Sequence, residues 1–146
     1  MIETFKSRVK DLKEGMQVEV NARGLKVIID EPQELGGTNK GMNPLEITLG
    51  ALGACQAIVA KMLAPMYDFS YEEFYMELEG DINSEGLNPE NDIRSGFQEI
   101  RMTMHFKTNE SLEKVKDFAK VVESTCPVSD SLHKGVKIVL KDIKKD

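Results

Sequence analysis

The chain has 146 residues, a length typical of one domain that buries its own core, and we expect a single domain over residues 1–146. Its net charge of −6 and its scattered basic residues argue against nucleic acid as a partner. No apolar segment of the signal-peptide kind follows the N-terminal methionine, so we expect a cytoplasmic protein.

The first thirty residues predict a meander of three antiparallel strands, over residues 4–12, 16–21 and 25–30. In the second strand Met16, Val18 and Val20 alternate with polar residues, the pattern of a half-buried strand. Two short segments with glycine, at residues 13–15 and 22–24, predict the turns. A long glycine-containing loop is expected over residues 31–42.

Residues 41–65 predict one long helix. Asn43 can accept hydrogen bonds from free amides at its start, Pro44 suits the first helical position, and Glu46 adds negative charge to the first turn. Pro65 is expected to end it. From residue 49 to 59 nearly every side chain is apolar or small, which predicts burial on all sides. The apolar run is shorter than the roughly 20 residues of a membrane span, so we expect no membrane partner.

The second half predicts two strands, at 71–83 and 97–107, with a long connection. A helix over 110–124 capped by Asn109 follows, then a short helix that ends at Gly135 and a last strand at 136–143. Grouped strands with few helical crossovers indicate an α+β fold, with antiparallel sheets packed around the central helix.

Two conventional kinds of site have little support in the sequence. The glycine-rich loop before the long helix resembles a phosphate cradle, but it lacks the Gly-Lys-Ser/Thr sequence of a Walker motif. His105 and His133 could join the two cysteines as metal ligands, but no close ligand pair exists. We therefore expect no metal and no bound cofactor.

The two cysteines, Cys55 and Cys126, are the candidates for chemistry, since a structural disulfide is uncommon in the cytoplasm. Cys126 precedes a short helix, whose N-terminal partial charge favours a thiolate. Cys55 lies in the middle of a buried helix, where a thiolate needs a nearby cation or hydrogen-bond donor. The simpler interpretation is that both are small core residues.

The segments Glu34-Leu35-Gly36-Gly37, Asn43-Pro44, 51–55 (ALGAC) and 126–129 (CPVS) resemble the OsmC/Ohr family of osmotically induced and organic-hydroperoxide-resistance proteins. The resemblance covers nearly the whole chain. It implies an intertwined homodimer with the cysteine helix buried at its centre and active sites at the subunit interface.

The resemblance also implies a thiol-dependent peroxidase that acts on organic hydroperoxides. By position Cys55 matches the residue that attacks the peroxide, and Cys126 matches the one that closes a disulfide. A dithiol of the lipoyl type is then the implied reductant.

The sequence departs from the Ohr branch at two points. In that branch a glutamate follows the helix-start proline and orients an arginine at the thiolate; here Leu45 takes its place, and Glu46 is the nearest carboxylate. The arginine of the first turn is absent too, so Arg23 in the second turn is the candidate cation, with Arg8 and Lys13 as rivals. The chain thus resembles a general OsmC-like member.

The leading hypothesis is a homodimeric hydroperoxide reductase in which Cys55 attacks, Cys126 resolves, and Glu46 and Arg23 support the Cys55 thiolate. One alternative is a redox-responsive or small-ligand-binding protein without significant peroxidase turnover. Another is a structural dimer whose cysteines only fill space.

Overall fold

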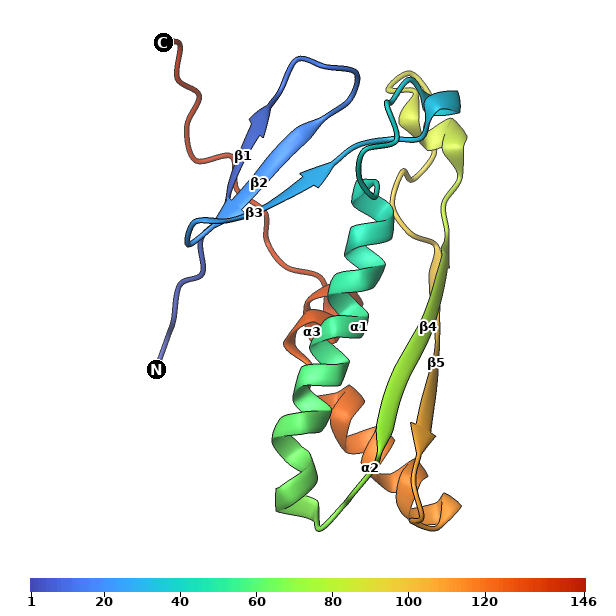
Figure 1. Cartoon of the computed structure of the whole chain (residues 1–146). Coiled ribbons are helices and arrows are strands. Elements are labelled where there is room, and N and C mark those ends of the chain that lie inside the picture. The colour runs from blue at the N-terminus through green and yellow to red at the C-terminus, as the bar shows by residue number, and fades with distance from the viewer. The chain divides into compact units, whose positions relative to one another are not determined.

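A computed structural model describes all 146 residues, which divide into two compact units, 1–49 and 50–146. Antiparallel strands and helices together confirm the α+β class (Figure 1). The order of elements along the chain is β1 (Arg8–Asp11), β2 (Val18–Ala22), β3 (Leu25–Ile29), α1 (Pro44–Leu63), β4 (Glu73–Asp81), β5 (Glu99–Lys107), α2 (Leu112–Thr125) and α3 (Pro127–Lys134).

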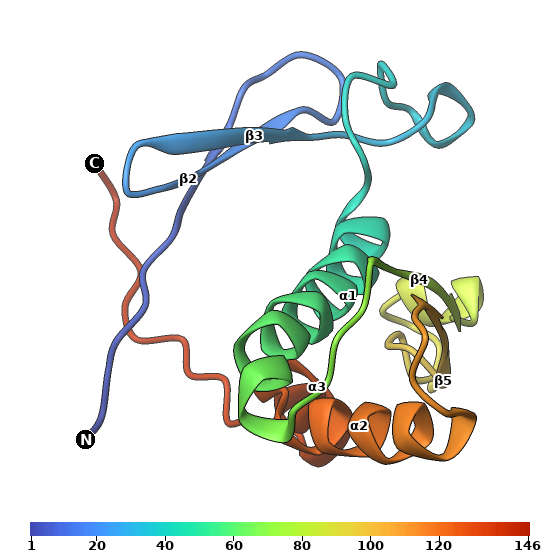
Figure 2. The same ribbon diagram turned by 60° about the horizontal axis from the view of Figure 1, so that its bottom comes forward.

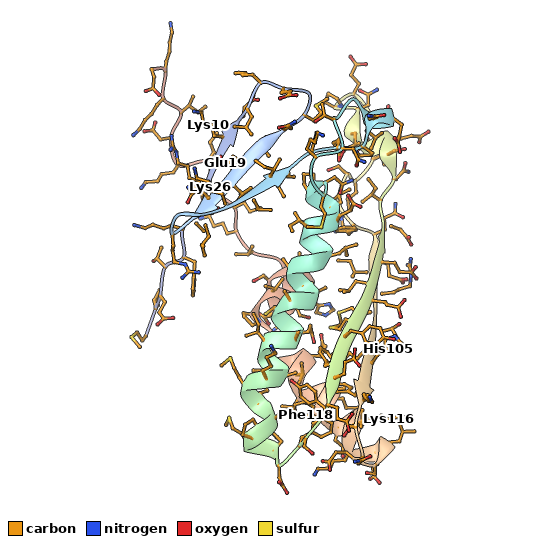
Figure 3. The ribbon with its side chains drawn as sticks, viewed as in Figure 1. Lys10, Glu19, Lys26, His105, Lys116 and Phe118 are labelled. Atoms are coloured by element: carbon orange, nitrogen blue, oxygen red, sulfur yellow. The ribbon has the colours of Figure 1, made fainter.

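The first unit contains the expected three-stranded meander, in the order β1-β2-β3. Its first strand is shorter than predicted, because only four residues pair with β2. Arg23 and Gly24 form the β2–β3 turn with positive φ angles of 57° and 83°, the geometry that matches strand twist in two-residue hairpins. Glu19 lies between Lys10 and Lys26 on this sheet (Figure 3) and pairs with Lys26 at 3.7 Å.

The loop over residues 31–42 is organised by one buried carboxylate, that of Asp30. Its Oδ1 accepts from the Glu31 N–H at 2.8 Å, and its Oδ2 accepts from the Thr38 hydroxyl at 2.6 Å and the Lys40 N–H at 3.0 Å. The loop therefore does bind an anion, but that anion is the carboxylate of Asp30. This occupancy argues against the phosphate-binding interpretation.

Two glycines make this tight loop sterically accessible. A Cβ atom at position 37 would lie 1.8 Å from the Glu31 carbonyl oxygen, and one at position 41 would lie 2.1 Å from the Ile28 carbonyl oxygen. Neither oxygen belongs to a flexible side chain that could move away. Both positions therefore require glycine for backbone to approach backbone.

The start of α1 is a reciprocal capping box, which confirms the role predicted for Asn43. The Asn43 Oδ1 accepts from the Glu46 N–H at 2.8 Å, and the Glu46 Oε1 accepts from the Asn43 N–H at 2.8 Å. Pro44 is the first helical residue, and α1 ends at Leu63, two residues before Pro65. The helix start is thus fixed by side chains of its own first turn.

In the second unit α1 and α2 cover one face of the β4–β5 hairpin (Figures 1 and 2). The core lies between them and contains Phe69, stacked on Phe118 at a centroid distance of 4.2 Å and edge-on to Phe106 at 5.6 Å. Phe118 points from α2 into this core (Figure 3). Gly53 lets α1 approach β4, since a Cβ there would lie 2.8 Å from a Leu78 methyl group. Each aromatic pair stabilises the fold by about 0.5–1.5 kcal/mol beyond the contribution of its buried apolar area.

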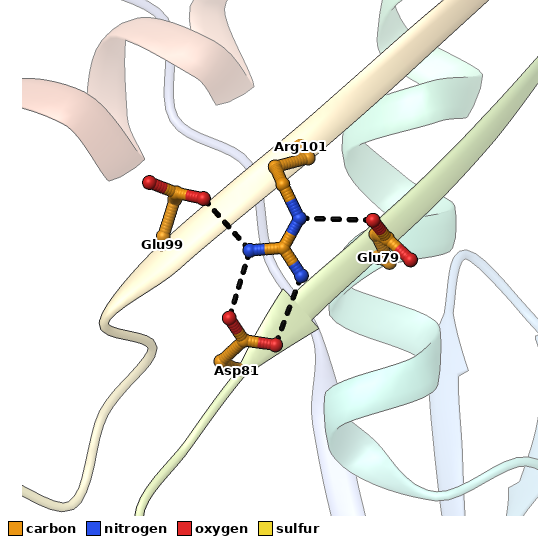
Figure 4. Close-up of polar contacts among 4 residues, drawn as sticks. All are labelled: Glu79, Asp81, Glu99 and Arg101. Atoms are coloured by element: carbon orange, nitrogen blue, oxygen red, sulfur yellow. Dashed lines mark hydrogen bonds and ion pairs between the residues drawn. The ribbon is translucent and has the colours of Figure 1, made fainter.

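The other face of the hairpin is polar, as the alternation in both strands predicts. Arg101 binds both carboxylate oxygens of Asp81, at 2.7 and 2.9 Å, and also pairs with Glu79 and Glu99 (Figure 4). His105 stacks on Tyr75 at 4.3 Å and contacts Glu77 at 2.7 Å. Such exposed pairs stabilise a fold only slightly, and here they fix the register of two nine-residue strands.

The cap of α2 was predicted two residues too early. Ser111, and not Asn109, accepts from the Lys114 N–H at 3.2 Å, and α2 begins at Leu112. The Thr108 hydroxyl accepts from the Glu110 N–H at 3.1 Å, which holds the preceding residues in a bend. The short helix ending at Gly135 is confirmed as α3.

The predicted last strand, residues 136–143, is wrong for the single chain, which has no regular structure there. Its apolar residues Val136, Ile138 and Leu140 are exposed. A strand needs a neighbour to satisfy its backbone groups, and the segment makes no ladder hydrogen bond in this chain.

The prediction that α1 is buried on all sides is also wrong for the single chain. Leu52, Gln56, Val59 and Ala60 are buried, but Ile58 is 58% and Met62 is 66% exposed. By length and composition, the segment 44–67 could cross a membrane, a criterion that core helices of globular proteins also meet.

The hydrogen bonds to Asp30 predict an acid-sensitive fold. Led by the Thr38 hydroxyl, they lower the pKa of Asp30 from 3.8 to about 2. A carboxyl group whose pKa is lower in the folded state stabilises the fold above about pH 4, and this contribution is lost as the pH falls through 2. The urea midpoint should therefore fall between pH 4 and pH 2. Asp30→Asn should be less stable at pH 7, and its urea midpoint should change less between pH 4 and pH 2. Asp117→Asn, which changes an exposed α2 carboxylate, is the control. An equally steep acid dependence in Asp30→Asn would contradict the assignment.

Candidate active site

The structure brings the two cysteines together within the second unit. Cys55 projects from the middle of α1, and Cys126 forms the junction between α2 and α3. The two thiols lie within hydrogen-bonding reach of each other. In both ribbon views α3 lies beside α1 (Figures 1 and 2). Residues that are 71 positions apart in sequence thus share one site.

Cys126 is held by the helix that it caps. Its Sγ accepts from the Ser129 N–H at 3.4 Å, and its carbonyl oxygen accepts from the Asp130 N–H at 3.1 Å. The Ser129 hydroxyl donates to Glu123 Oε1 at 2.8 Å, which ties the first turn of α3 back to α2. Pro127 occupies the first helical position. The sulfur position is therefore set by two helices at once.

The expectation that the helix terminus favours a Cys126 thiolate is wrong for this conformation. Cys126 is only 1% exposed, and burial raises the pKa of its thiol. The neighbouring Cys55 thiol raises that pKa too, while the Ser129 N–H lowers it by a smaller amount. Because desolvation outweighs the helix terminus, Cys126 is a protonated thiol at neutral pH.

Cys55 opens onto a shallow apolar groove of about 560 Å³. Thr125 and Pro127, on either side of Cys126 in sequence, form one wall of it. The α1 residues form the rest: Ala51, Ala54, Ile58, Val59, Met62 and Leu63. Of the two thiols, Cys55 is thus the one open to a small apolar molecule.

The lining of this groove contains no arginine, lysine or histidine. Arg23, the candidate cation, lies in the β2–β3 turn of the first unit, and its rivals Arg8 and Lys13 are in the same unit. Lys13 pairs with Asp11 at 3.3 Å. Glu46 also belongs to the first unit, where its carboxylate caps α1. Within the second unit the structure therefore brings the two cysteines together, while Arg23 and Glu46 are parts of the other unit.

Two residues near the thiols were missed from the sequence. Gln56 follows Cys55 and is fully buried, and neither its Nε2 nor its Oε1 has a hydrogen-bond partner in this chain. A polar residue inside an apolar helical run is the signal that could have found it. Ser129, which donates to the Cys126 sulfur, gave no distinct signal, because serine is common at helix starts.

The histidines stand apart from the thiols. His105 is on the polar face of β5, and His133 is in the last turn of α3. No group of three or more His, Cys, Asp and Glu side chains in the chain is arranged to hold a metal ion.

A family model described as OsmC-like protein matches residues 37–141, a range that includes both cysteines. The chain belongs to the OsmC-like family. The curated relatives include a hydroperoxide reductase of Mycoplasma pneumoniae, 30% identical over 95 residues, which cover 65% of this chain and 64% of the relative. A hydroperoxide reductase of Mycoplasma genitalium is 24% identical over 127 residues, which cover 87% of this chain and 79% of the relative.

Solved structures support the OsmC-like fold independently. The crystal structure of an OsmC-like protein from Mycoplasma pneumoniae aligns with a TM-score of 0.79 and 22% identity, over 91% of this chain and 89% of that one. An organic hydroperoxide resistance protein OsmC from Legionella pneumophila aligns with a TM-score of 0.66 and 22% identity, over 90% of each chain.

The unequal exposure of the two thiols predicts unequal alkylation of this OsmC-like protein. Iodoacetamide should modify Cys55 at least tenfold faster than Cys126 at pH 8, because Cys126 is buried and its raised pKa lowers the thiolate fraction. Mass spectrometry of tryptic peptides from the reduced protein measures both rates. Unfolding in urea is the control and should equalise them. Faster modification of Cys126 in the folded protein would contradict the geometry described above.

Proposed function

We propose that this protein is a cysteine-dependent peroxidase that reduces organic hydroperoxides through a Cys55–Cys126 thiol/disulfide cycle. The observation that carries the proposal is the contact between the two thiols beside an apolar groove, onto which Cys55 alone opens. The names of the two Mycoplasma relatives, both hydroperoxide reductases, point to the same chemistry.

The first step of the cycle is attack of the Cys55 thiolate on the outer oxygen of the hydroperoxide. The O–O bond breaks, Cys55 becomes a sulfenic acid, and the leaving alkoxide takes a proton to become an alcohol. The Cys126 thiol then attacks the Cys55 sulfur, a disulfide forms, and water leaves with the Cys126 proton. A dithiol reductant of the lipoyl type restores both thiols and is itself oxidised to a disulfide.

The apolar lining of the groove suits the organic part of such a substrate. Ile58, Val59 and Met62 offer contact to an alkyl or aryl group and little to hydrogen peroxide, which has no apolar part. The protected Cys126 thiol suits the resolving role, because a buried, protonated thiol does not react with the peroxide itself. The cycle also needs a reducing compartment, which agrees with the expected cytoplasmic location.

The thiolate of Cys55 needs a cation that its own groove does not supply. A half-buried thiolate in an apolar groove would be costly without a charged or hydrogen-bonding partner. We propose Arg23 for this role, with Arg8 and Lys13 as the rivals, and Glu46 as the carboxylate that supports the cation. Leu45 stands where the Ohr branch has the glutamate that orients the arginine, so here Glu46 has to orient the cation instead.

We propose further that the active form is a homodimer. Ala51, Ala54, Ile58 and Met62 follow one another at helical spacing and form an apolar face on α1 that its own chain leaves exposed. A second copy of α1 is a suitable cover, because the alanines allow close helix packing and the face carries no charge to pair with another kind of partner. The groove at Cys55 shares these residues, so in the proposed dimer the substrate site would lie at the subunit interface. The segment 136–143 also has exposed apolar residues for a second chain to cover.

The alternative function is a redox-responsive or small-ligand-binding protein without significant peroxidase turnover. The absence of a cation from the groove lining favours it.

A thiol count tests the peroxidase proposal. One equivalent of cumene hydroperoxide should remove both free thiols of the reduced protein within seconds, and hydrogen peroxide should act more slowly. Cys126→Ser should hold a sulfenic acid on Cys55, trapped by dimedone and located by mass spectrometry. Arg23→Gln should slow thiol loss at least tenfold, against Lys26→Gln as the control in the adjoining strand. If both thiols survive the organic peroxide, the peroxidase proposal is wrong and the alternative function stands. If Arg8→Gln or Lys13→Gln slows thiol loss and Arg23→Gln does not, that residue and not Arg23 is the cation.

Light scattering after size-exclusion chromatography tests the dimer. The protein should have twice the mass of one chain, and Ile58→Glu should be monomeric, because a charge would be buried at the centre of the contact. Thr103→Glu adds the same charge to the polar face of β5 and should leave the dimer intact. A monomeric wild-type protein would overturn the proposal.

A further inference from the structure

The second unit contains another cavity, of about 610 Å³, which shares no lining residue with the groove at Cys55. It lies between β5, the segment that leads into β5, and the α2–α3 pair. Its size is in the range of small-molecule sites, roughly 300–1,000 Å³. Its apolar wall comes from Leu52, Phe97, Ile100, Met102 and Leu132.

Two basic side chains at this cavity are without a charged partner. Arg94 and His133 both line it, and neither forms an ion pair, whereas the neighbouring Lys134 and Arg101 are paired. The Arg94 guanidinium lies beside the backbone of Gly96, since a Cβ there would be in ordinary van der Waals contact with Nε and Nη2, at 3.8 Å from each. Two free donors beside an apolar wall are the usual elements of a site for an amphipathic anion.

The acidic residues of the lining are already engaged. Glu99 accepts from Arg101 at 2.7 Å, and Glu123 accepts from the Ser129 hydroxyl at 2.8 Å. Their hydrogen bonds direct these carboxylates to partners within the protein, whereas the Arg94 guanidinium has none. A bound anion would therefore supply the partner that Arg94 lacks.

We propose that this cavity binds an amphipathic monocarboxylate. Its carboxylate pairs with Arg94 and accepts a hydrogen bond from His133, and its alkyl chain lies against Leu52, Met102 and Leu132. The binding does not depend on the proposed peroxidase cycle, because the cavity and the Cys55 groove have separate walls.

The site is coupled by geometry to Cys126. Ser129 lines the cavity, and its N–H donates to the Cys126 sulfur. A ligand that contacts Ser129, Leu132 and His133 holds α3 in place and keeps that sulfur buried. Occupancy of the cavity should therefore slow the reactions of Cys126 while leaving Cys55 accessible.

Calorimetric titration of the full-length, reduced protein with decanoate, below its micelle-forming concentration, tests the proposal. We expect saturable one-to-one binding, about tenfold weaker in Arg94→Gln and unchanged in Lys120→Gln, which removes an exposed charge from α2. Decanol should bind at least tenfold more weakly than decanoate. Met62→Gln, in the Cys55 groove, should bind decanoate normally.

A second measurement separates this site from the peroxidase. In Cys55→Ser, saturating decanoate should slow alkylation of Cys126 at least threefold, and Arg94→Gln should abolish the protection. No saturable binding, equal binding of decanol, or a loss of affinity in Met62→Gln but not in Arg94→Gln would overturn the proposal. Failure of peroxide reduction would leave every one of these results unaffected.

Discussion

The C-terminal unit depends on the packing of α1, a helix that is apolar around nearly its whole circumference. One face is satisfied by the β4–β5 hairpin and by α2, through Gly53 against Leu78 and through the stacked Phe69 and Phe118. Close approach is possible only because small residues alternate with larger ones along the helix. The opposite face, with Ile58 and Met62, stays open in the single chain. The same geometry that buries Gln56 leaves Cys55 at the boundary between the two faces.

That boundary is where α2 gives way to α3, and Cys126 serves both helices. It ends α2, caps α3 through its sulfur, and meets Cys55 through the same atom. The groove and the larger cavity lie on either side of this junction, with Thr125 and Pro127 in one wall and Glu123 and Ser129 in the other. A substitution at Cys126 should therefore alter the walls of both the groove and the cavity, since the connecting turn is short and hydrogen-bonded at both ends.

Features governed by local chemistry could be predicted from the sequence. The alternation of β4 and β5, the Arg23–Gly24 turn and the Asn43–Glu46 box follow from side-chain period, allowed φ angles and short-range hydrogen bonds. The pairing of Cys55 with Cys126 came from the family resemblance, since nothing in the spacing of two distant residues predicts contact.

Features set by distant parts of the chain could not be predicted. Residues 136–143 have the pattern of a strand, but a pattern does not provide the neighbouring edge. The ionisation of Cys126 depends on desolvation by other elements, which outweighs the helix end visible in the sequence. The sequence of the loop before α1 predicted a glycine-rich connection. It did not predict that the loop folds around the carboxylate of Asp30.

The sulfur–amide bond at the start of α3 has a consequence for how this protein can be dissected. An alanine at position 126 would remove a thiol and a helix cap together, so a loss of function could arise from fraying as well as from missing chemistry. A serine removes only the redox-active atom, because its hydroxyl oxygen can take over the hydrogen bond from Ser129. The Cys126 sulfur both caps α3 and carries the redox chemistry, so exchanging it for oxygen keeps the first role and removes the second.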